Sequence, residues 1–251
     1  MSETAIRFAG ATVRYAGADR AAIDGVTFDV AAGETVVLLG PSGCGKSTLL
    51  RTVNRLVALD AGRVEFYGSD VATLDAVELR RHIGYAIQAV GLFAHMTVAQ
   101  NVAVVPELLG WERDAVRTRV DELLELVRLD PVRYRNRRPR ALSGGEAQRV
   151  GVARALAAKP RALLMDEPFG AVDALVRADL QRELLRIVRE LKTTTLFVTH
   201  DVAEALRLAD RIVVMRDGGI EQVAAPDDLL ERPATAYVHD LLHAGDLPRR
   251  A

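Results

Sequence analysis

Apolar and polar residues follow different periods in different parts of the chain. From residue 5 to about 30 they alternate at every second position, as Ile6 and Phe8 do, and again Val26 and Phe28. Side chains of a strand point to opposite faces in turn, so this stretch predicts antiparallel strands with one buried face. From 161 onward, short apolar runs alternate with helical stretches. That order is typical of a chain built on a parallel sheet.

The stretch 89–157 has a mostly helical pattern. Its apolar residues recur about every 3.6 positions, with acids and arginines on the opposite side; they are Val116, Val120, Leu123, Leu124 and Val127. Packing against a core explains this stripe without any further role. Gly218-Gly219 predicts a hairpin turn, and residues 245–251 are expected to fray.

One glycine-rich stretch has the form G-x-x-x-x-G-K-S, and a short strand over 34–39 and a helix from Ser47 to about Leu56 flank it. Glycines allow the backbone to curl, so that successive N–H groups point at phosphate oxygens. Lys46 supplies a positive charge for β- and γ-phosphates, and Ser47 a hydroxyl for Mg²⁺. The stretch therefore predicts a nucleoside triphosphate site that comprises Gly40, Pro41, Ser42, Gly43, Cys44, Gly45, Lys46, Ser47 and Thr48.

A second candidate element is the apolar run 162–165, which two acids, Asp166 and Glu167, follow directly. A parallel strand carries function at its carboxyl end. There Asp166 is expected to hold Mg²⁺ through water, and Glu167 to orient and polarise the attacking water as general base. Taken alone, the run is equally a buried strand with two solvated acids; the phosphate loop favours the catalytic interpretation.

Composition narrows the class of protein. The chain has 251 residues, 49% of them hydrophobic, and a formal net charge of −1, which argues against a dedicated nucleic-acid binder. No apolar run reaches the length of about 18 residues that indicates a membrane span, and the polar start predicts no signal peptide. Cys44 is the single cysteine, so no internal disulfide is expected. We interpret it as a small side chain in a tight loop rather than a redox centre.

Five arginines fall within residues 133–140, with no acid among them. Such a run is usually a solvated loop. Polybasic segments are also drawn to anionic lipid headgroups, or to a partner at the membrane. The sequence leaves both interpretations open.

The stretch Leu142-Ser143-Gly144-Gly145-Glu146 lies between the phosphate loop and Asp166-Glu167. The order and spacing of these motifs resemble the ATP-binding subunit of an ABC transporter over nearly the whole chain. The resemblance implies an α/β fold of the P-loop NTPase type, with a RecA-like parallel sheet core, an N-terminal antiparallel β subdomain and an inserted helical subdomain. It divides one ABC ATPase domain, 1–251, into a core of 1–88 with 158–245, a helical signature subdomain of 89–157, and a tail of 246–251.

The resemblance also implies roles for single residues. Tyr15 matches the aromatic that stacks on adenine, although an ordinary strand aromatic is the alternative. Gln88 matches the glutamine that senses the γ-phosphate and Mg²⁺, and His200 the switch histidine. With Lys46 and Glu167 these two complete the implied catalytic set, and the implied metal set is Ser47, Gln88 and Asp166.

Ser143, Gly144 and Gly145 match the signature that closes on ATP, and the loop 169–173, which ends in Asp173, matches the one that communicates between subunits. A helix beginning at the two glycines presents free N–H groups to a γ-phosphate. In the family this phosphate belongs to the opposing subunit, so the resemblance implies two composite sites in a head-to-tail dimer. Glu146 stands where glutamine is usual, which leaves its contact open.

The type of transporter is suggested by residues 84–111. The stretch Ile87-Gln88-x-x-Gly91-Leu92-Phe93 and the later 105–111 look like importers of glycine betaine, choline and carnitine. An importer of methionine or a polar amino acid is the alternative, since it shares every catalytic motif. A soluble ABC ATPase of DNA repair or translation is disfavoured, because no coiled-coil insertion is present.

The resemblance further implies ATP and Mg²⁺ as cofactors and integral membrane permease subunits as partners. An extracytoplasmic solute-binding protein would act through the permease, and a second ATPase subunit would complete a homodimer; no nucleic acid is expected. The expected location is the cytoplasmic face of the inner membrane, as a peripheral subunit. Many members carry regulatory CBS domains after the ATPase, for which residues up to Ala251 leave no room. Osmotic regulation would then arise elsewhere or be absent.

Overall fold

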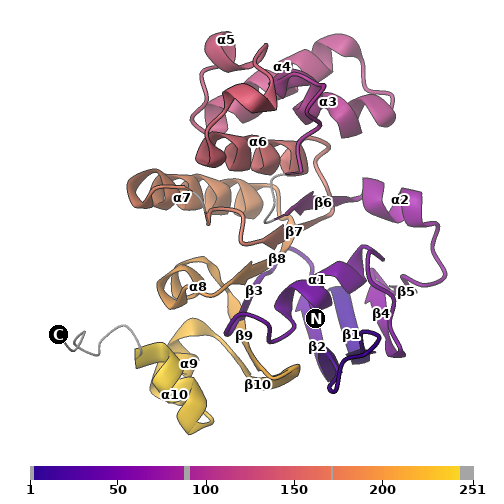
Figure 1. Cartoon of the computed structure of the whole chain (residues 1–251), viewed down its shortest axis with the longest axis vertical. Helices are drawn as coiled ribbons and strands as arrows, with labels where there is room; N and C mark the ends of the chain where they lie inside the picture. The colour runs from indigo at the N-terminus through magenta and orange to yellow at the C-terminus, as the bar shows by residue number, and fades with distance from the viewer. Residues whose placement is uncertain (1–2, 88–90, 171, 244–251) are drawn as a thin grey trace. The chain divides into compact units, whose positions relative to one another are not determined.

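The computed structural model describes residues 3–87, 91–170 and 172–243 (Figure 1). The chain divides into two compact units, Met1–Leu74 with Leu196–Ala251 and Asp75–Thr195. The division into 1–88 with 158–245 and 89–157 stays a prediction. Within the described ranges, no helix combines the length and apolarity that crossing a bilayer requires.

The first unit opens with an antiparallel sheet in the order β2-β1-β4-β5. Its strands are β1 (Thr4–Val13), β2 (Ile23–Ala31), β4 (Ala61–Phe66) and β5 (Ser69–Asp70). Phe8 pairs with Phe28 across β1 and β2, and their rings stack with centroids 4.7 Å apart. The alternating pattern of residues 5–30 therefore predicted this part correctly, because inward-facing side chains such as Phe8 and Val26 supply its buried face.

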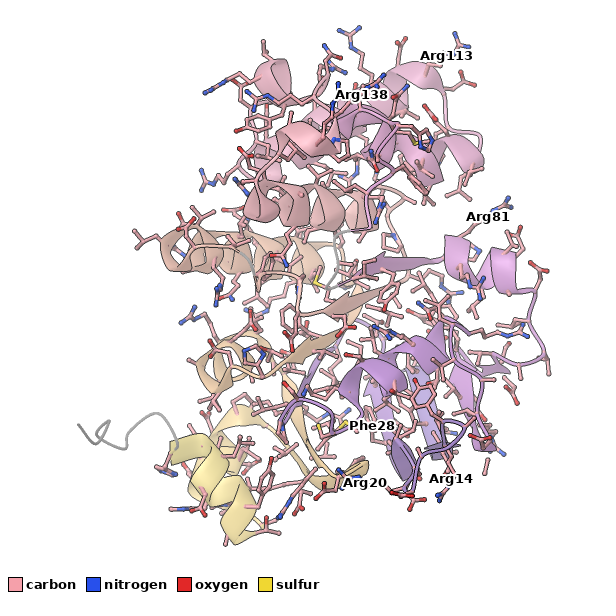
Figure 2. All side chains as sticks on the ribbon, viewed as in Figure 1. Arg14, Arg20, Phe28, Arg81, Arg113 and Arg138 are labelled. Atoms are coloured by element: carbon pink, nitrogen blue, oxygen red, sulfur yellow. The ribbon has the colours of Figure 1, made fainter. Side chains whose placement is uncertain are left out.

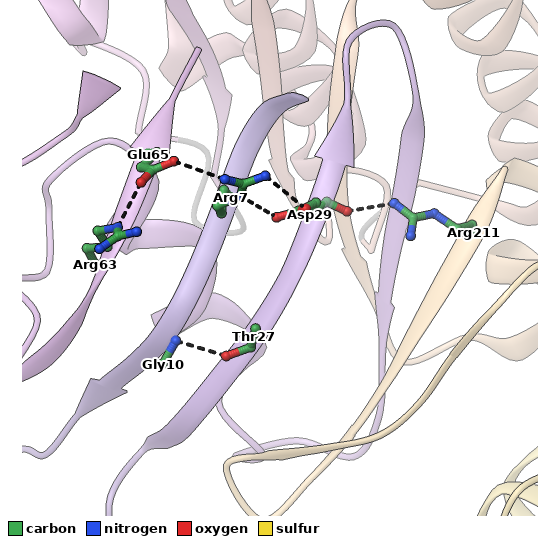
Figure 3. A network of polar contacts seen from close by, with 7 residues as sticks. All are labelled: Arg7, Gly10, Thr27, Asp29, Arg63, Glu65 and Arg211. Atoms are coloured by element: carbon green, nitrogen blue, oxygen red, sulfur yellow. Dashed lines mark hydrogen bonds and ion pairs between the residues drawn. The ribbon is translucent and has the colours of Figure 1, made fainter. Parts of the chain in front are cut away.

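Charged side chains connect neighbouring strands on the polar face of this sheet (Figure 3). Arg7 on β1 bonds to Asp29 on β2 through its Nε at 3.0 Å and lies 3.8 Å from Glu65 on β4. Arg63 adds a 2.7 Å bond to Glu65, and Arg211 donates to the carbonyl oxygen of Asp29 at 2.6 Å. Exposed ion pairs contribute little energy each. The contacts of Arg7 and Arg63 join strands of this sheet, whereas Arg211 comes from β9 (Arg211–Arg216), outside it.

A second group of strands in this unit carries the phosphate loop. Strand β3 (Thr35–Leu39) is buried along its whole length, pairs in parallel with β9 (Arg211–Arg216), and lies beside β8 (Thr194–Thr199). Strand β10 (Gly219–Ala224) returns antiparallel to β9. Asp217 and Gly218 both have positive φ, 48° and 85°, and form a two-residue hairpin turn. The turn lies one residue before the predicted Gly218-Gly219, because Gly219 is already the first residue of β10.

The helices of the first unit cover these strands or follow them. They are α1 (Lys46–Val53), α8 (Val202–Leu208), α9 (Pro226–Glu231) and α10 (Ala236–His243). Helix α8 packs on β3, whereas α9 packs on the β9–β10 hairpin. The sequence pattern predicted α1 and α8. It did not distinguish α9 and α10, which are short and follow a proline-containing turn.

The second unit contains a parallel strand pair and a helical cluster. Strand β6 (Ile83–Ala86) pairs with β7 (Ala162–Asp166). The helices, with one 3₁₀ turn (Pro139–Ala141), are α2 (Ala76–Arg81), α3 (Val98–Leu108), α4 (Arg113–Leu126), α5 (Pro131–Tyr134), α6 (Gly144–Leu156) and α7 (Ala174–Glu190). The predicted stripe from Val116 to Val127 is buried, so it does form part of a core.

Helix α6 approaches β6 very closely in this unit. Gly84 lies on β6, and a Cβ at this position would overlap the carbonyl oxygen of Ala155 and come within 2.9 Å of Leu163. At the carboxyl end of α6, the guanidinium of Arg119 donates to the carbonyls of Leu156 and Ala157 at 3.0 and 3.3 Å. Helix α6 is therefore held at its side by a glycine and at its end by an arginine from α4.

We expect Gly84→Ala to destabilise the protein by about 1–3 kcal/mol, because the obstructing atom is backbone and cannot rotate away. Denaturant unfolding measures the change. Gly219→Ala is the matched control, since the nearest atom to a Cβ at this position is the Arg216 carbonyl oxygen, at an ordinary contact distance of 3.7 Å. Equal stability of the two variants would contradict the close approach of α6 to β6.

Candidate functional site

The phosphate loop connects β3 to α1 and has a backbone that only glycine adopts easily. Gly40, Gly43 and Gly45 have φ of 158°, 81° and 104°. A Cβ on Gly40 would overlap the carbonyl oxygen of Met215, and one on Gly45 would overlap that of Ala22. Conformation and space together therefore require glycine at both ends of the loop.

Lys46 is folded back into this loop. Its side chain is 5% exposed, and Nζ donates to the carbonyl oxygens of Gly40 and Pro41 at 2.7 and 2.8 Å. The ammonium thus lies against the first residues of the loop, although it starts from the first residue of α1. A cation held at this place is suited to neutralising phosphate charge, and that role of Lys46 stays a prediction.

Cys44 supports the loop from inside. Its side chain is 3% exposed, and Lys46 Nζ lies 3.8 Å from its Sγ. Its carbonyl oxygen accepts the N–H of Gly218, from the β9–β10 turn, at 3.2 Å. A small buried side chain suits this position, in agreement with the interpretation of Cys44 as a packing residue.

Tyr15 and His200 belong to the same unit as the loop. Tyr15 is 48% exposed, and its hydroxyl lies 3.2 Å from Oγ1 of Thr48, so the phenol adjoins the end of the loop. An exposed ring at this place can stack on a base. His200 follows β8 and is exposed, and the next residue, Asp201, caps α8. Gln88 lies outside the described residues.

The acidic pair ends β7 in the second unit. Asp166 is fully buried, whereas Glu167 is half-buried and has a φ of 47°. A positive φ is costly for a residue other than glycine and is often found at functional positions. The carbonyl oxygen of Glu167 accepts the N–H of Gly170 at 3.2 Å, which turns the chain after the strand.

Asp173, which the sequence placed in a loop between subunits, also caps a helix. Its carboxylate accepts the N–H of Val176 at 3.0 Å and so caps the start of α7. Arg177 donates to the carbonyl of Val172 at 2.8 Å and holds the same turn. An aspartate directly before a helical stretch is a capping pattern that the sequence already displayed. Ala171, in the same loop, lies outside the described residues.

The signature stretch forms the start of α6. Ser143 is the N-cap: its Oγ accepts the N–H of Glu146 at 3.2 Å, and Glu146 Oε2 accepts the N–H of Ser143 at 2.7 Å. This reciprocal pair is a capping box, which uses two of the amides at the helix start. The amides of Gly144 and Gly145 belong to the same first turn, at the positive end of the helix dipole.

The contact of Glu146, open in the sequence, is thereby established. Its second oxygen, Oε1, accepts the hydroxyl hydrogen of Tyr134 at 2.6 Å. That hydrogen bond, followed by the one from Ser143, holds the pKa of Glu146 below its ordinary value. The same bond is the main cause that raises the pKa of Tyr134. The pattern S-x-x-E at 143–146 could have predicted the capping box, but nothing in the sequence pointed to Tyr134.

The arginine-rich stretch 133–140 is partly built into the second unit. Arg135 pairs with Asp121 at 3.2 Å, and the carbonyls of Arg135 and Arg137 accept the N–H groups of Ala99 and Val98 at the start of α3. Arg133, Arg138 and Arg140 are exposed, and Figure 2 labels Arg138 on this stretch. Solvation and contact with lipid or partner both remain predictions for these three side chains.

A cleft of about 440 Å³ opens beside β6 in the second unit. Its lining includes Arg80, Gly84, Tyr85, Phe93 and Arg154. Arg154 donates to the carbonyl of Gly91 at 2.8 Å and lies over the ring of Phe93. The cleft therefore combines apolar walls with guanidinium groups.

The loop 91–97 beside this cleft is held by one buried amide. Asn101 is fully buried; its Nδ2 donates to the carbonyls of Thr97 and Phe93 at 2.9 and 3.2 Å, and its Oδ1 accepts the N–H of Phe93 at 2.8 Å. The sequence did not single out Asn101. A polar residue inside the helical pattern of α3 was its only signal.

The oxygen donors predicted for Mg²⁺ are of the right chemical kind. The hydroxyl of Ser47 and the carboxylate of Asp166 suit a hard cation, which usually takes few protein ligands together with phosphate and water oxygens. Among the described residues, no group of three or more His, Cys, Asp or Glu side chains could hold a metal by itself.

Known proteins resemble this chain closely. A family model described as ABC transporter matches residues 23–170. The glycine betaine/carnitine/choline transport ATP-binding protein OpuCA of Bacillus subtilis is 47% identical over 91% of this chain and 60% of its own length. The sulfate/thiosulfate import ATP-binding protein CysA of Bradyrhizobium diazoefficiens is 50% identical over 88% of this chain and 64% of its own. The chain thus spans roughly 60% of the length of curated relatives such as OpuCA.

A solved structure matches the fold. The ATP-binding cassette MJ0796, in a dimeric post-hydrolysis state bound to ADP and Pi, aligns with a TM-score of 0.80 at 31% identity. The alignment covers 88% of this chain and 98% of that one. The predicted fold class is confirmed: an antiparallel β subdomain and a mixed sheet with helices, of the α/β P-loop type.

The capping box predicts a pH dependence of stability. Because the folded state lowers the pKa of Glu146, its charge stabilises the fold above the ordinary value of 4.5, and this contribution is lost as the pH falls through the folded-state pKa. We expect the difference in unfolding free energy between the native chain and Glu146→Gln to shrink as the pH falls below 4.5. A difference that does not change with pH would contradict the capping contact.

Proposed function

This chain belongs to the ABC transporter family, and from that premise we propose that it binds and hydrolyses ATP to energise the import of a small solute through a membrane permease. The observation that carries the proposal is the phosphate loop, with two glycines that no other residue can replace and Lys46 held against the loop carbonyls. A quaternary-ammonium osmoprotectant is the proposed solute.

Each predicted residue has one step in this reaction. Lys46 neutralises charge on the β- and γ-phosphates, and the ring of Tyr15 stacks on adenine. Ser47, Asp166 and Gln88 are the proposed Mg²⁺ ligands, directly or through water; the ion would neutralise charge on the phosphate oxygens. Glu167 orients the attacking water and takes its proton as the water oxygen bonds to the γ-phosphorus and the bond from that phosphorus to the β,γ-bridging oxygen breaks, which releases ADP. His200 responds to the γ-phosphate.

The signature is proposed to act on the nucleotide of a second copy of the chain. The capping box occupies the amides of Ser143 and Glu146, so those of Gly144 and Gly145 are the first-turn groups offered to a γ-phosphate. The dimeric state of MJ0796 supports this arrangement. ATP would then join two copies head to tail, with Asp173 in the loop between subunits, and hydrolysis would release them.

The proposed partner at the membrane is a permease, and the cleft beside β6 is its proposed docking surface. Gly91 and Phe93 line this cleft and belong to the stretch that resembles osmoprotectant importers. The amide of Asn101 keeps that loop in one shape. We propose that the chain lies peripherally on the cytoplasmic face of the inner membrane, and that a solute-binding protein acts through the permease.

The solute itself is supported by similarity alone. The printed name of OpuCA includes glycine betaine, carnitine and choline. CysA, a sulfate and thiosulfate import protein, is equally similar, so import of an inorganic anion is the second candidate. Importers of methionine or polar amino acids share the same catalytic residues.

Glu167→Gln should lower ATP hydrolysis by about 100-fold or more, because the general base is lost, and should accumulate as an ATP-bound dimer in size-exclusion chromatography. Lys46→Ala tests binding rather than catalysis. It removes the ammonium charge proposed to face the phosphates and two hydrogen bonds to the loop, so ATP binding should weaken by about tenfold or more. Normal turnover in the lysine variant would refute the site. A Glu167→Gln protein that stays monomeric with ATP would refute the composite dimer.

Uptake of labelled solutes tests the transported class. The panel contains glycine betaine, choline, carnitine, sulfate, methionine and glutamine, in cells whose only copy is either the native chain or Glu167→Gln. Loss of quaternary-ammonium uptake alone is the expected result. Loss of sulfate or amino-acid uptake instead would leave the ATPase in place and reassign the solute.

A further inference from the structure

The hydroxyl of Tyr134 bonds directly to the carboxylate in the signature helix. We propose that Tyr134 is a positioning residue: it holds one oxygen of Glu146 while the amide of Ser143 holds the other, so that this carboxylate closes the helix start and does not compete with a phosphate for it. The inference rests on the proposed function, because the phosphate in question is that of the ATP bound by the other copy.

The contacts account for both oxygens of the carboxylate. Oε2 accepts the N–H of Ser143 at 2.7 Å, and Oε1 accepts the hydroxyl of Tyr134 at 2.6 Å. Bonds from an anion to strong donors are short and directional, so they specify the side-chain rotamer as well as its charge distribution. Without the phenol, one oxygen of an acid in the first turn would be free to turn towards the two glycine amides.

Tyr134 is itself held in place. It lies at the end of α5, where its N–H donates to the carbonyl of Asp130 at 3.0 Å. The guanidinium of Arg137 lies over its ring, 4.5 Å from the centroid, and Arg137 Nε donates to the carbonyl of Arg133 at 3.1 Å. The arginine-rich stretch therefore supports the signature through Tyr134.

The chemistry of residue 146 makes the two side chains a unit. A glutamine at this position could still complete the capping box, but it has one acceptor oxygen and no charge. Loss of the Tyr134 hydroxyl should therefore lower activity most when residue 146 is a carboxylate. The contribution of the phenol should therefore depend on the identity of residue 146, as it does for any directly bonded pair.

The test compares Tyr134→Phe with the native chain, and Tyr134→Phe/Glu146→Gln with Glu146→Gln, in the full chain. The readouts are kcat, the KM for ATP, and ATP-driven dimer formation in the Glu167→Gln background. We expect Tyr134→Phe to lower kcat and dimer formation by about tenfold when Glu146 is present, with ATP binding to the monomer unchanged. Against the Glu146→Gln parent, the same change should cost less than about twofold.

Equal losses in both backgrounds, or no loss in the native background, would overturn the inference. Glu146→Asp is the second variant, since its shorter side chain cannot reach both donors; it should reproduce the loss even if Tyr134→Phe folds poorly. Tyr237→Phe, on α10, is the matched hydroxyl deletion, because among the described residues no group hydrogen-bonds to that hydroxyl; it should behave as the native chain. A native chain that hydrolyses ATP while Tyr134→Phe is unimpaired overturns the inference alone; a native chain without ATP-dependent dimers or hydrolysis overturns the proposed function as well.

Discussion

The first turn of a helix leaves backbone N–H groups without partners inside the helix, and two helices of this chain, α1 in the first unit and α6 in the second, begin at glycine-rich stretches. At α1 the N-cap is Gly45, which has no side chain that could accept from these amides, and the preceding loop has positive φ at Gly43 and Gly45. At α6 a capping box satisfies two of the amides and leaves those of the two glycines at the surface of the first turn. Both ends carry a partial positive charge, which attracts an anion such as phosphate.

Close backbone contacts hold both helices, one just before the start of α1 and one near the carboxyl end of α6. Gly45, before α1, lies against the carbonyl of Ala22, and Gly84 on β6 lies against that of Ala155 in α6. A side chain at either position would push the helix away by the width of a methyl group or more. The same residue type thus serves two needs: a conformation at the phosphate loop, and a distance of approach at the signature helix.

Acidic residues near these ends need partners of their own. Glu146 has the amide of Ser143 and the phenol of Tyr134, and Asp173 has the amide of Val176. In each case a carboxylate that family resemblance connects with a ligand or a second subunit also completes a helix start. A change at either residue will therefore alter local stability as well as activity, and measurements of both are needed to separate them.

The sequence by itself indicated the phosphate loop, the acidic strand end and the alternation of strands and helices, because each depends on residues adjacent in the chain or on a short hydrophobic period. Family resemblance added the signature, the P-loop fold class and the roles of Tyr15 and His200, which no local pattern indicates. Only the tertiary structure showed that Tyr134 bonds to Glu146, that Asn101 holds the loop beside the cleft, and that Gly84 admits α6. Those contacts join residues whose spacing along the chain follows neither the helical nor the strand period. They arise from the packing of one element against another, which a local sequence pattern does not reveal.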